Sequence, residues 1–477
     1  MKTRELVNLG MPKGQTITMA KQAIGEYAKN LKEKVNKEEL LQIIRDIVKN
    51  PEDFIKNKYF GSLAQSVIKT SQEYVKYEDR KEPAPYKQWG TDIEEEAIQQ
   101  MENACKLPIS VRGALMPDAH LGYGLPIGGV LATDNAIIPY AVGMDIACRM
   151  KMTVLDMPVG ALTGQFDKLK NAITRETSFG VGAHFKKRHN HKVLDEDWNV
   201  SPITKQFKDK AWSQLGSSGS SNHFVEFGIL TVEHNDISLE HDKYSDIGLE
   251  YGKYIALLSH GGSRGTGYEV ATHYSKLAHQ IHPELPHELS DLSWLDMDSE
   301  EGVEYWNAME LMGRYAAANH EIIHQYIAKN LGVDVLLDIE NHHNFAWKEK
   351  YDGREVIVHR KGATPAGKGD IGIIPGSMAT PAYVVFGKGN ELSLNSASHG
   401  AGRKMSRKAA KKQFTWSEAN KFLAEKGVKL LSAGLDEIPM AYKDIDVVMA
   451  DQSDLVEIKA KFDPKIVKMA EGGEKKW

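Results

Sequence analysis

The chain is poor in cysteine, has no long uncharged apolar run and carries no strong excess of charge of either sign. Cys105 and Cys148 are the only cysteines among its 477 residues, which excludes a disulfide scaffold and favours a reducing, cytoplasmic setting. No uncharged apolar stretch reaches about 18 residues, so no membrane-spanning helix is expected. The first ten residues contain no apolar segment, and we expect no secretory signal. The 60 Lys+Arg against 65 Asp+Glu, a net charge of -5, argue against a bulk polyanion binder but allow a local basic groove.

The composition divides the chain into two regions. Residues 16 to 80 are rich in charge, and the apolar residues of the segment 37 to 50 recur at helical spacing. The charged, proline-bearing stretch 76 to 85 favours a boundary. We therefore predict a helical N-terminal segment, 1–85, followed by a second domain, 86–477.

Beyond about residue 105, glycine becomes frequent and the apolar runs become short and β-branched. The runs 127 to 131 and 355 to 359 predict buried strands between turns. The segment 186 to 197 is expected to form an exposed loop, and the pattern returns to helix at 301 to 331. Helices mixed with irregularly spaced strands predict an α+β fold instead of strict β-α-β alternation.

Polar residues embedded in glycine-rich, apolar segments are the main chemical feature of the second region. Asp145 and Cys148 lie three residues apart, so one turn can direct both side chains to one point. A thiolate, a carboxylate and imidazoles suit a borderline metal ion such as zinc, manganese, cobalt or iron. The alternative is that Cys148 is only a small buried residue, which is the usual state of a free cysteine.

Three histidines are the candidate imidazole partners, namely His223, His260 and His343. Each lies beside Gly, Asn or Ser and not on an amphipathic helix face. Their long, irregular spacing follows no zinc-finger rule, and any one of them alone is more often an ordinary core or surface residue. A rival histidine group between residues 273 and 287 is interleaved with lysine, proline and glutamate, which favours a solvated helix and loop.

His399 precedes a glycine-rich turn and a basic run, residues 403 to 412. A histidine can act as a nucleophile and form a covalent phosphoramidate, glycines let backbone N–H groups approach phosphate, and basic residues can neutralise a polyanion. The alternative is a glycine turn that leads into a solvated basic helix. Arg264 and the turn Pro375 to Met378 also fit an anion site, although such loops more often serve only as turns.

Nine segments, taken in order, resemble the RtcB family of RNA-splicing and repair ligases. They are MPDAHLGYGLPIGG, AVGMDIAC, NHFVEFG, HGGSRGTG, HHNFA, RKGAT, IPGSM, SHGAGRKMSR and AYKDID. Several motifs in family order, over roughly residues 85 to 470, are far more specific than one short pattern. The resemblance implies a single compact RtcB-like catalytic domain behind the N-terminal helices. It also implies a GTP- and Mn²⁺-dependent ligase that joins RNA 3′-phosphate or 2′,3′-cyclic phosphate ends to 5′-hydroxyl ends through a histidine–GMP intermediate, in tRNA splicing or RNA repair.

The resemblance implies roles for individual residues. His399 corresponds to the nucleophile that accepts GMP. The implied ligands of two Mn²⁺ ions are Asp145, Cys148, His223, His260 and His343, with Cys148 bridging the ions. The implied nucleotide contacts are Asn222, His223, Phe224, Val225, Glu226, His343, Asn344, Pro375, Gly376, Ser377, Met378, Ala382, His399, Gly400, Ala401, Gly402 and Lys468. The expected RNA or phosphate contacts are Arg264, Arg403, Lys404 and Arg407.

Some positions depart from the family pattern, and two other functions are weighed beside the ligase. A serine-rich stretch, 217 to 221, replaces much of a glycine run, and Ala379 and Ala382 stand where Gly and Ser are usual. These changes bear on how the nucleotide fits. The alternatives are a metal-dependent cyclic-phosphate phosphohydrolase and a non-catalytic RNA-binding homologue. The expected partner is RNA with the ends named above, an archease-type activator is considered, and no membrane partner is expected.

Overall fold

The computed structural model describes residues 5–6, 9–11, 15–30, 36–73, 78–233 and 247–471. The chain divides into two compact units, of which the first comprises Met1–Glu78 with His279–Ser290 and the second Asp79–Ala278 with Asp291–Trp477. The predicted boundary after residue 85 falls just inside the second unit. Among the described residues, no helix is both long and apolar enough to cross a bilayer.

The N-terminal unit is a small group of packed helices, as expected for this segment. Its elements are α2 (Gln15–Asn30), α3 (Lys37–Lys49), the 3-10 turn η1 (Pro51–Phe54) and α4 (Gly61–Glu73). The side chain of Asn36 caps α3 by accepting a hydrogen bond from the backbone N–H of Glu38. Ile44 and Ile47 project from α3 into a core shared with Phe60, so the helical spacing of apolar residues is what builds this unit.

The larger unit is built on a sheet with the strand order β13-β14-β17-β6-β7-β5-β9, to which β16 adds by pairing with β17. The strands are β5 (Arg149–Leu155), β6 (Phe224–Val232), β7 (Gly252–Gly261), β9 (Val335–His342), β13 (Ile371–Pro375), β14 (Ala382–Gly387), β16 (Lys429–Ser432) and β17 (Val456–Met469). Both faces of the sheet are buried. Along β7, Ile255 and Leu257 enter one core, whereas Ala256 and Leu258 enter another.

A second sheet has the order β1-β2-β3-β11-β10. Its strands are β1 (Tyr86–Gln88), β2 (Ser110–His120), β3 (Ile127–Thr133), β10 (Asn344–Tyr351) and β11 (Arg354–Lys361). The two strands predicted from β-branched runs are β3 and β11, which pair with each other in antiparallel fashion. A short ladder joins β12 (Ala363–Pro365) to β15 (Ser396–Ser398), and β15 leads directly into His399.

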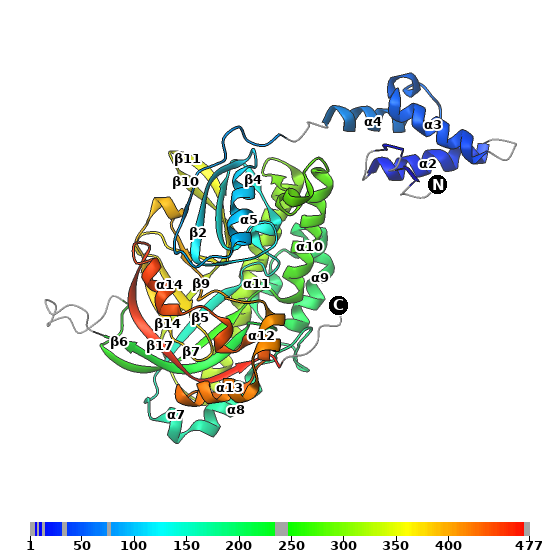
Figure 1. The fold of residues 1–477 in the computed structure, drawn as a ribbon. Coiled ribbons are helices and arrows are strands. Elements are labelled where there is room, and N and C mark those ends of the chain that lie inside the picture. Colours follow the sequence, from blue (N-terminus) through cyan, green and yellow to red (C-terminus); the bar gives the residue numbers. More distant parts are fainter. Residues whose placement is uncertain are drawn as a thin grey trace. The chain divides into compact units, whose positions relative to one another are not determined.

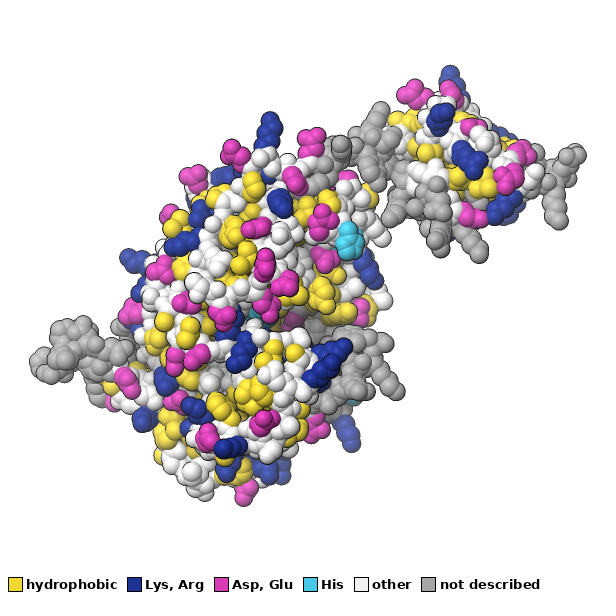
Figure 2. All heavy atoms as spheres, in the orientation of Figure 1, with side chains coloured by type: hydrophobic (Ala, Val, Ile, Leu, Met, Phe, Trp, Pro, Cys, Tyr) yellow, Lys and Arg dark blue, Asp and Glu magenta, His cyan; other side chains and the backbone are white. Residues whose placement is uncertain are grey.

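Helices pack around these sheets (Figure 1). They are α5 (Glu95–Cys105), α6 (Pro139–Val142), α7 (Ala161–Gly164), α8 (Phe166–Glu176), α9 (Pro202–Gln214), α10 (Arg264–Ile281), α11 (Glu300–Leu331), α12 (Arg407–Gln413), α13 (Trp416–Glu425) and α14 (Ile445–Asp451). The predicted helix at 301 to 331 is α11, which Ser299 caps at its start and the left-handed Gly332 ends. On the face that Figure 2 shows, acidic and basic side chains are interspersed.

The strand register brings four polar residues to one end of the larger sheet. Arg149 pairs with Gly261 on one side and with His342 on the other, and Phe224 pairs with His260. Cys148 directly precedes Arg149, His223 precedes Phe224, and His343 follows His342. Neighbouring antiparallel strands therefore deliver Cys148, His223, His260 and His343 to the same place.

Candidate active site

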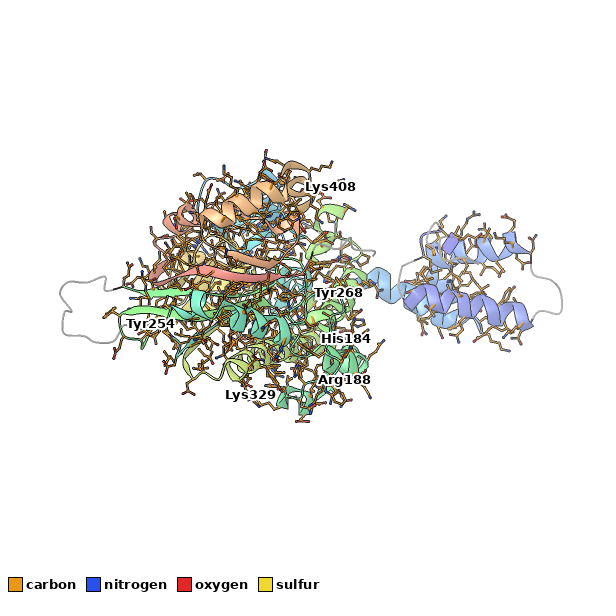
Figure 3. The ribbon with its side chains drawn as sticks, turned by 90° about the horizontal axis from the view of Figure 1, so that it is seen from below. His184, Arg188, Tyr254, Tyr268, Lys329 and Lys408 are labelled. Atoms are coloured by element: carbon orange, nitrogen blue, oxygen red, sulfur yellow. The ribbon has the colours of Figure 1, made fainter. Side chains whose placement is uncertain are left out.

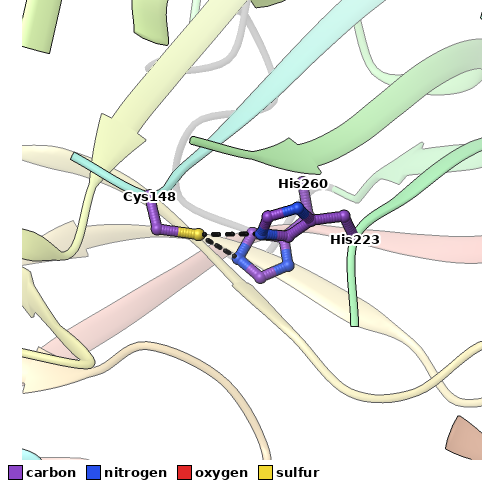
Figure 4. Close-up of side chains that lie close together, drawn as sticks. All are labelled: Cys148, His223 and His260. Atoms are coloured by element: carbon purple, nitrogen blue, oxygen red, sulfur yellow. Dashed lines mark hydrogen bonds between the residues drawn. The ribbon is translucent and has the colours of Figure 1, made fainter. Parts of the chain in front are cut away.

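Five side chains meet at this end of the sheet and direct their donor atoms to one another. The Cys148 sulfur lies 3.1 Å from His260 Nε2 and 3.5 Å from His223 Nε2 (Figure 4). His260 Nε2 lies 3.2 Å from His343 Nε2, and His223 Nε2 lies 3.0 Å from Asp145 Oδ2. Asp145 and Cys148 share a tight turn in which the Cys148 N–H donates to the Asp145 carbonyl. The predicted donor set is thus assembled in space.

The ring nitrogens of two histidines are left ready for a cation. His260 Nδ1 donates to the Asn222 carbonyl at 3.2 Å, so its Nε2 keeps a lone pair that faces Cys148 and His343. His343 Nδ1 is buried and has no hydrogen-bond partner among the described residues. The Nε2 atoms of His260 and His343 lie 3.2 Å apart beside a thiol, an arrangement that offers few good hydrogen bonds without a cation. It is a good set of metal ligands, because thiolate, imidazole and carboxylate suit borderline metals.

The charge states also favour a cation at this place. Burial lowers the pKa of His260 to about 3 and that of His343 well below its usual value, so both rings stay neutral. Burial alone would raise the pKa of Asp145, but the hydrogen bond from His223 and the Arg264 guanidinium hold it well below its usual range. Burial and the Asp145 charge raise the pKa of the Cys148 thiol, so a metal must displace its proton on binding.

Close packing behind the cluster explains two features of the HGGSRGTG segment. A β-carbon on Gly262 would lie 2.3 Å from Asp145 Oδ1, so only glycine fits there. The Arg264 guanidinium is buried, donating from Nε to the Gly262 carbonyl at 3.0 Å and lying with Nη2 3.2 Å from His223 Nδ1. Arg264, predicted to contact RNA phosphate, therefore faces His223 of the donor cluster in this structure.

His399 lies beside this cluster and is held by a carboxylate that sequence reasoning missed. Its Nδ1 lies 2.7 Å from Oδ2 of the fully buried Asp118, which also accepts hydrogen bonds from the N–H groups of His399 and Gly400. Because Nδ1 donates, Nε2 keeps its lone pair. The His399 ring centroid lies 5.0 Å from that of His343. Asp118 stands within the segment MPDAHLGYGLPIGG, for which the resemblance implied no residue role.

Lys443 ties the two segments of this pair together. Its Nζ donates to the carbonyls of Pro117 at 3.1 Å and Ala119 at 3.4 Å, the two neighbours of Asp118. Its backbone N–H donates to the Gly402 carbonyl at 3.0 Å. The turn that follows His399 is thereby fixed against the strand end that carries Asp118.

A cavity of about 600 Å³ opens beside His399. Predicted nucleotide contacts that line it are Asn222, Phe224, Glu226, Pro375, Gly376, Ser377, Met378, Ala382, His399, Gly400, Ala401 and Gly402. Glu226 contributes a buried carboxyl to this lining, and burial raises its pKa well above the usual value. A volume of this size fits a nucleotide-sized ligand.

Five predicted nucleotide contacts do not line the cavity. His223 and His343 belong to the donor cluster, and Val225 packs into a hydrophobic core. The Asn344 side chain donates to the Asp145 carbonyl at 3.2 Å. Lys468 Nζ donates to Thr177 Oγ1 at 3.0 Å, and its neighbour Met469 lines the cavity instead.

The basic run after His399 is partly neutralised from within the protein. Arg403 Nη1 lies 3.0 Å and Arg407 Nε 3.2 Å from the buried carboxylate of Glu437, and Arg403, Arg407 and Glu437 all line the cavity. Lys404 is exposed. Glu437 had no distinguishing mark in the sequence, and its role as the anchor of two arginines is visible only in the fold.

The chain is similar to known proteins along most of its length. A family model described as "tRNA-splicing ligase RtcB" matches residues 100–469. The chain is 34% identical over 408 residues to the RNA-splicing ligase RtcB of Escherichia coli K12, covering 79% of this chain and 95% of that protein. It is 32% identical over 445 residues to the tRNA-splicing ligase RtcB of Nanoarchaeum equitans, covering 78% and 91% respectively. The donor cluster, Asp118 and His399 all lie inside the matched range, whereas residues 1 to 78 lie outside it.

The donor cluster generates a prediction about metal binding. We expect Cys148→Ala to weaken Mn²⁺ binding by more than about 100-fold, since losing a ligand exceeds the roughly 10- to 100-fold effect of losing a ligand's partner. Binding should strengthen with rising pH, because the thiol proton must leave. Titration followed by the electron paramagnetic resonance of free Mn²⁺ measures both. The matched control is Cys105→Ala, at the other cysteine, which is buried beside Met101; equal weakening in both variants would contradict the assignment.

Proposed function

Because the chain belongs to the RtcB family of tRNA-splicing ligases, we propose that it joins RNA 3′-phosphate or 2′,3′-cyclic phosphate ends to 5′-hydroxyl ends, with GTP as the energy source. We further propose that it works in the cytoplasm, in tRNA splicing or RNA repair, and that an archease-type protein activates it. The observation that carries the proposal is the anchored His399, whose Nδ1 is engaged by Asp118 at 2.7 Å beside a metal-donor cluster and a nucleotide-sized cavity.

In the proposed first step, His399 Nε2 attacks the α-phosphorus of GTP. A P–N bond forms, the bond to the β-phosphate oxygen breaks, and pyrophosphate leaves. Asp118 accepts the Nδ1 hydrogen bond throughout, so the ring keeps its orientation and the positive charge that develops on it is compensated. This is how a buried carboxylate makes one imidazole nitrogen a reliable nucleophile.

In the following steps GMP passes from His399 to the RNA 3′-phosphate, and the two RNA ends are then joined. The RNA 3′-phosphate attacks the phosphorus of the histidine-bound GMP, which breaks the P–N bond and activates the RNA end. The 5′-hydroxyl then attacks the RNA 3′-phosphorus and releases GMP. A cyclic phosphate must first be hydrolysed to the 3′-phosphate. Two Mn²⁺ ions held by Asp145, Cys148, His223, His260 and His343 would polarise phosphoryl oxygens and neutralise charge.

The cavity supplies the proposed contacts to the nucleotide and to phosphate. Asn222, Glu226 and the turn Pro375 to Met378 line it, and we assign them to the guanosine nucleotide. Gly400, Ala401 and Gly402 line the same cavity and are assigned to the nucleotide as well. The Gly400 N–H already donates to Asp118 and the Ala401 N–H to the Pro375 carbonyl, so these two groups hold the turn in place. Arg403 and Arg407 border the cavity, and with the exposed Lys404 they are the proposed contacts of the RNA backbone.

The proposal predicts a covalent adduct. Purified protein incubated with Mn²⁺ and GTP should gain the mass of one GMP, and peptide mapping should locate it on His399. His399→Ala should bind Mn²⁺ normally and gain no mass. The control is His273→Ala, since His273 lies on α10 and does not line the cavity, so its removal should leave the adduct in place. Hydrolysis of cyclic phosphate with no adduct, in the presence of an activating partner, would favour a phosphohydrolase instead.

Asp118 generates a separate prediction about rate. In Asp118→Asn the amide no longer fixes the Nδ1 proton, so the productive tautomer of His399 is lost in part. We expect the rate of adduct formation to fall by at least about 100-fold, while Mn²⁺ affinity stays unchanged because Asp118 is not among the cluster residues. Rapid-mixing kinetics with labelled GTP gives the rate. A rate close to that of the unaltered protein would show that Asp118 does not position the nucleophile.

A further inference from the structure

The loop predicted to be exposed at 186 to 197 belongs to a surface with an unusual composition. Between residues 184 and 192 there are four Lys or Arg and three His, with no Asp or Glu, in a chain of net charge -5. Lys186 and Lys187 are exposed and form no ion pair among the described residues. Arg188 and His191 of this stretch pair with Asp209 and Glu321, whereas Lys186 and Lys187 keep their charge available for a polyanion.

Aromatic side chains are built into the same surface and are held rigidly. The Arg188 guanidinium lies 4.7 Å above the Trp212 ring and forms an ion pair with Asp209 at 2.6 Å. The Trp212 Nε1–H donates to the His189 carbonyl at 2.9 Å. Trp212 is nevertheless 39% exposed. A tryptophan that is held in place and still partly exposed offers a surface on which a base can stack.

A second aromatic stack continues this surface onto α11. The His189 ring lies 4.6 Å from Phe185 and 4.8 Å from Tyr326, in both cases edge to face. Tyr326 is 41% exposed. We call Phe185, Lys186, Lys187, Arg188, His189, Trp212 and Tyr326 together the basic–aromatic surface.

The basic–aromatic surface is joined to the metal cluster through the backbone. Gly180 N–H donates to the Gly219 carbonyl at 2.7 Å, and Ser218 N–H donates to the Ser178 carbonyl at 2.9 Å. A β-carbon on Gly219 would lie 2.4 Å from His223 Nδ1, so this glycine touches a cluster ligand. In Figure 3, His184 and Arg188 lie on the same side of the view as Lys408 of the basic run, whereas Tyr254 lies toward the opposite side.

From these contacts we infer that the basic–aromatic surface binds the single-stranded RNA that flanks the reacting end, with phosphates on Lys186 and Lys187 and an unpaired base on Trp212. Basic residues interleaved with exposed aromatics are what binding of single-stranded nucleic acid without sequence preference requires. The inference rests on the proposed function, because it assigns the nucleic acid to the substrate of that site. It adds a contact region that none of the motif residues supplies.

The experiment compares RNA length in the full chain. Fluorescence anisotropy measures the affinity for a long single-stranded RNA with a 3′-phosphate and for the same RNA trimmed to its last few nucleotides, at several salt concentrations. In Lys186→Ala/Lys187→Ala, only the long RNA should bind more weakly. The slope of log affinity against log salt should fall in magnitude by about 1.4, because each phosphate neutralised on a single strand contributes about 0.7.

A second variant tests stacking separately from charge. Trp212→Ala should weaken long-RNA binding about tenfold without changing the salt slope, and Trp212→Phe should restore most of the loss, since aromatic stacking tolerates the change of ring. The melting temperature of each variant shows whether α9 is intact. If Trp212→Ala unfolds, the lysine pair still decides the matter.

The matched control uses an exposed lysine beside a tryptophan elsewhere. Lys348 lies 5.3 Å from the Trp306 ring, and Trp306 and Tyr326 are about 30 Å apart along α11. Equal weakening in Lys348→Ala, equal weakening for short and long RNA, or unchanged long-RNA binding would each overturn the inference. Formation of the GMP adduct without RNA keeps the two proposals apart. If no adduct forms, the ligase proposal fails even when the surface binds RNA. If the adduct forms normally and RNA binding does not depend on length, only the inference about the basic–aromatic surface fails.

Discussion

The antiparallel register of β9, β5, β7 and β6 is the constraint on which the site depends. Cys148, His223, His260 and His343 stand at or beside strand ends, so their convergence follows from which backbone groups pair. A slip of one residue would turn each strand's side chains to the opposite face. Such a slip is opposed along the whole sheet, because both faces of β7 are buried in hydrophobic cores. The packing far from the site therefore helps to fix the positions of the donor atoms.

The site combines parts from two sheets with different tasks. The larger sheet holds the donor cluster, whereas His399 follows β15 and is hydrogen-bonded to Asp118 near the end of β2. The 5.0 Å separation of the His343 and His399 rings is the point where these two parts meet. Lys443 keeps the second part rigid by bonding carbonyls on both sides of Asp118. Metal chemistry and nucleophile placement can thus be disturbed separately.

Patterns in the sequence predicted much of this arrangement, and the misses have physical causes. The close spacing of Asp145 and Cys148 pointed to a shared turn, which is present. The strands β3 and β11 were predictable because buried β-branched runs have few alternatives. Asp118 was missed because its partner lies 281 residues away, and local pattern carries no information on such a contact. Val225 and Lys468 do not line the cavity, because alternation along a strand turns neighbouring side chains to opposite sides, and their contacts with the nucleotide stay predictions.

The pairing of Arg403 and Arg407 with Glu437 has a consequence for turnover. A guanidinium that already shares its charge with a buried carboxylate attracts phosphate less strongly than one facing only water and solvent ions. The carboxylate of Glu437 holds both guanidinium groups in fixed positions. The same pairing lowers their affinity for a polyanion. For the ligase proposed above, a lower affinity of these two arginines for phosphate would ease release of the joined strand. Glu437 lowers the net positive charge that this edge of the cavity presents.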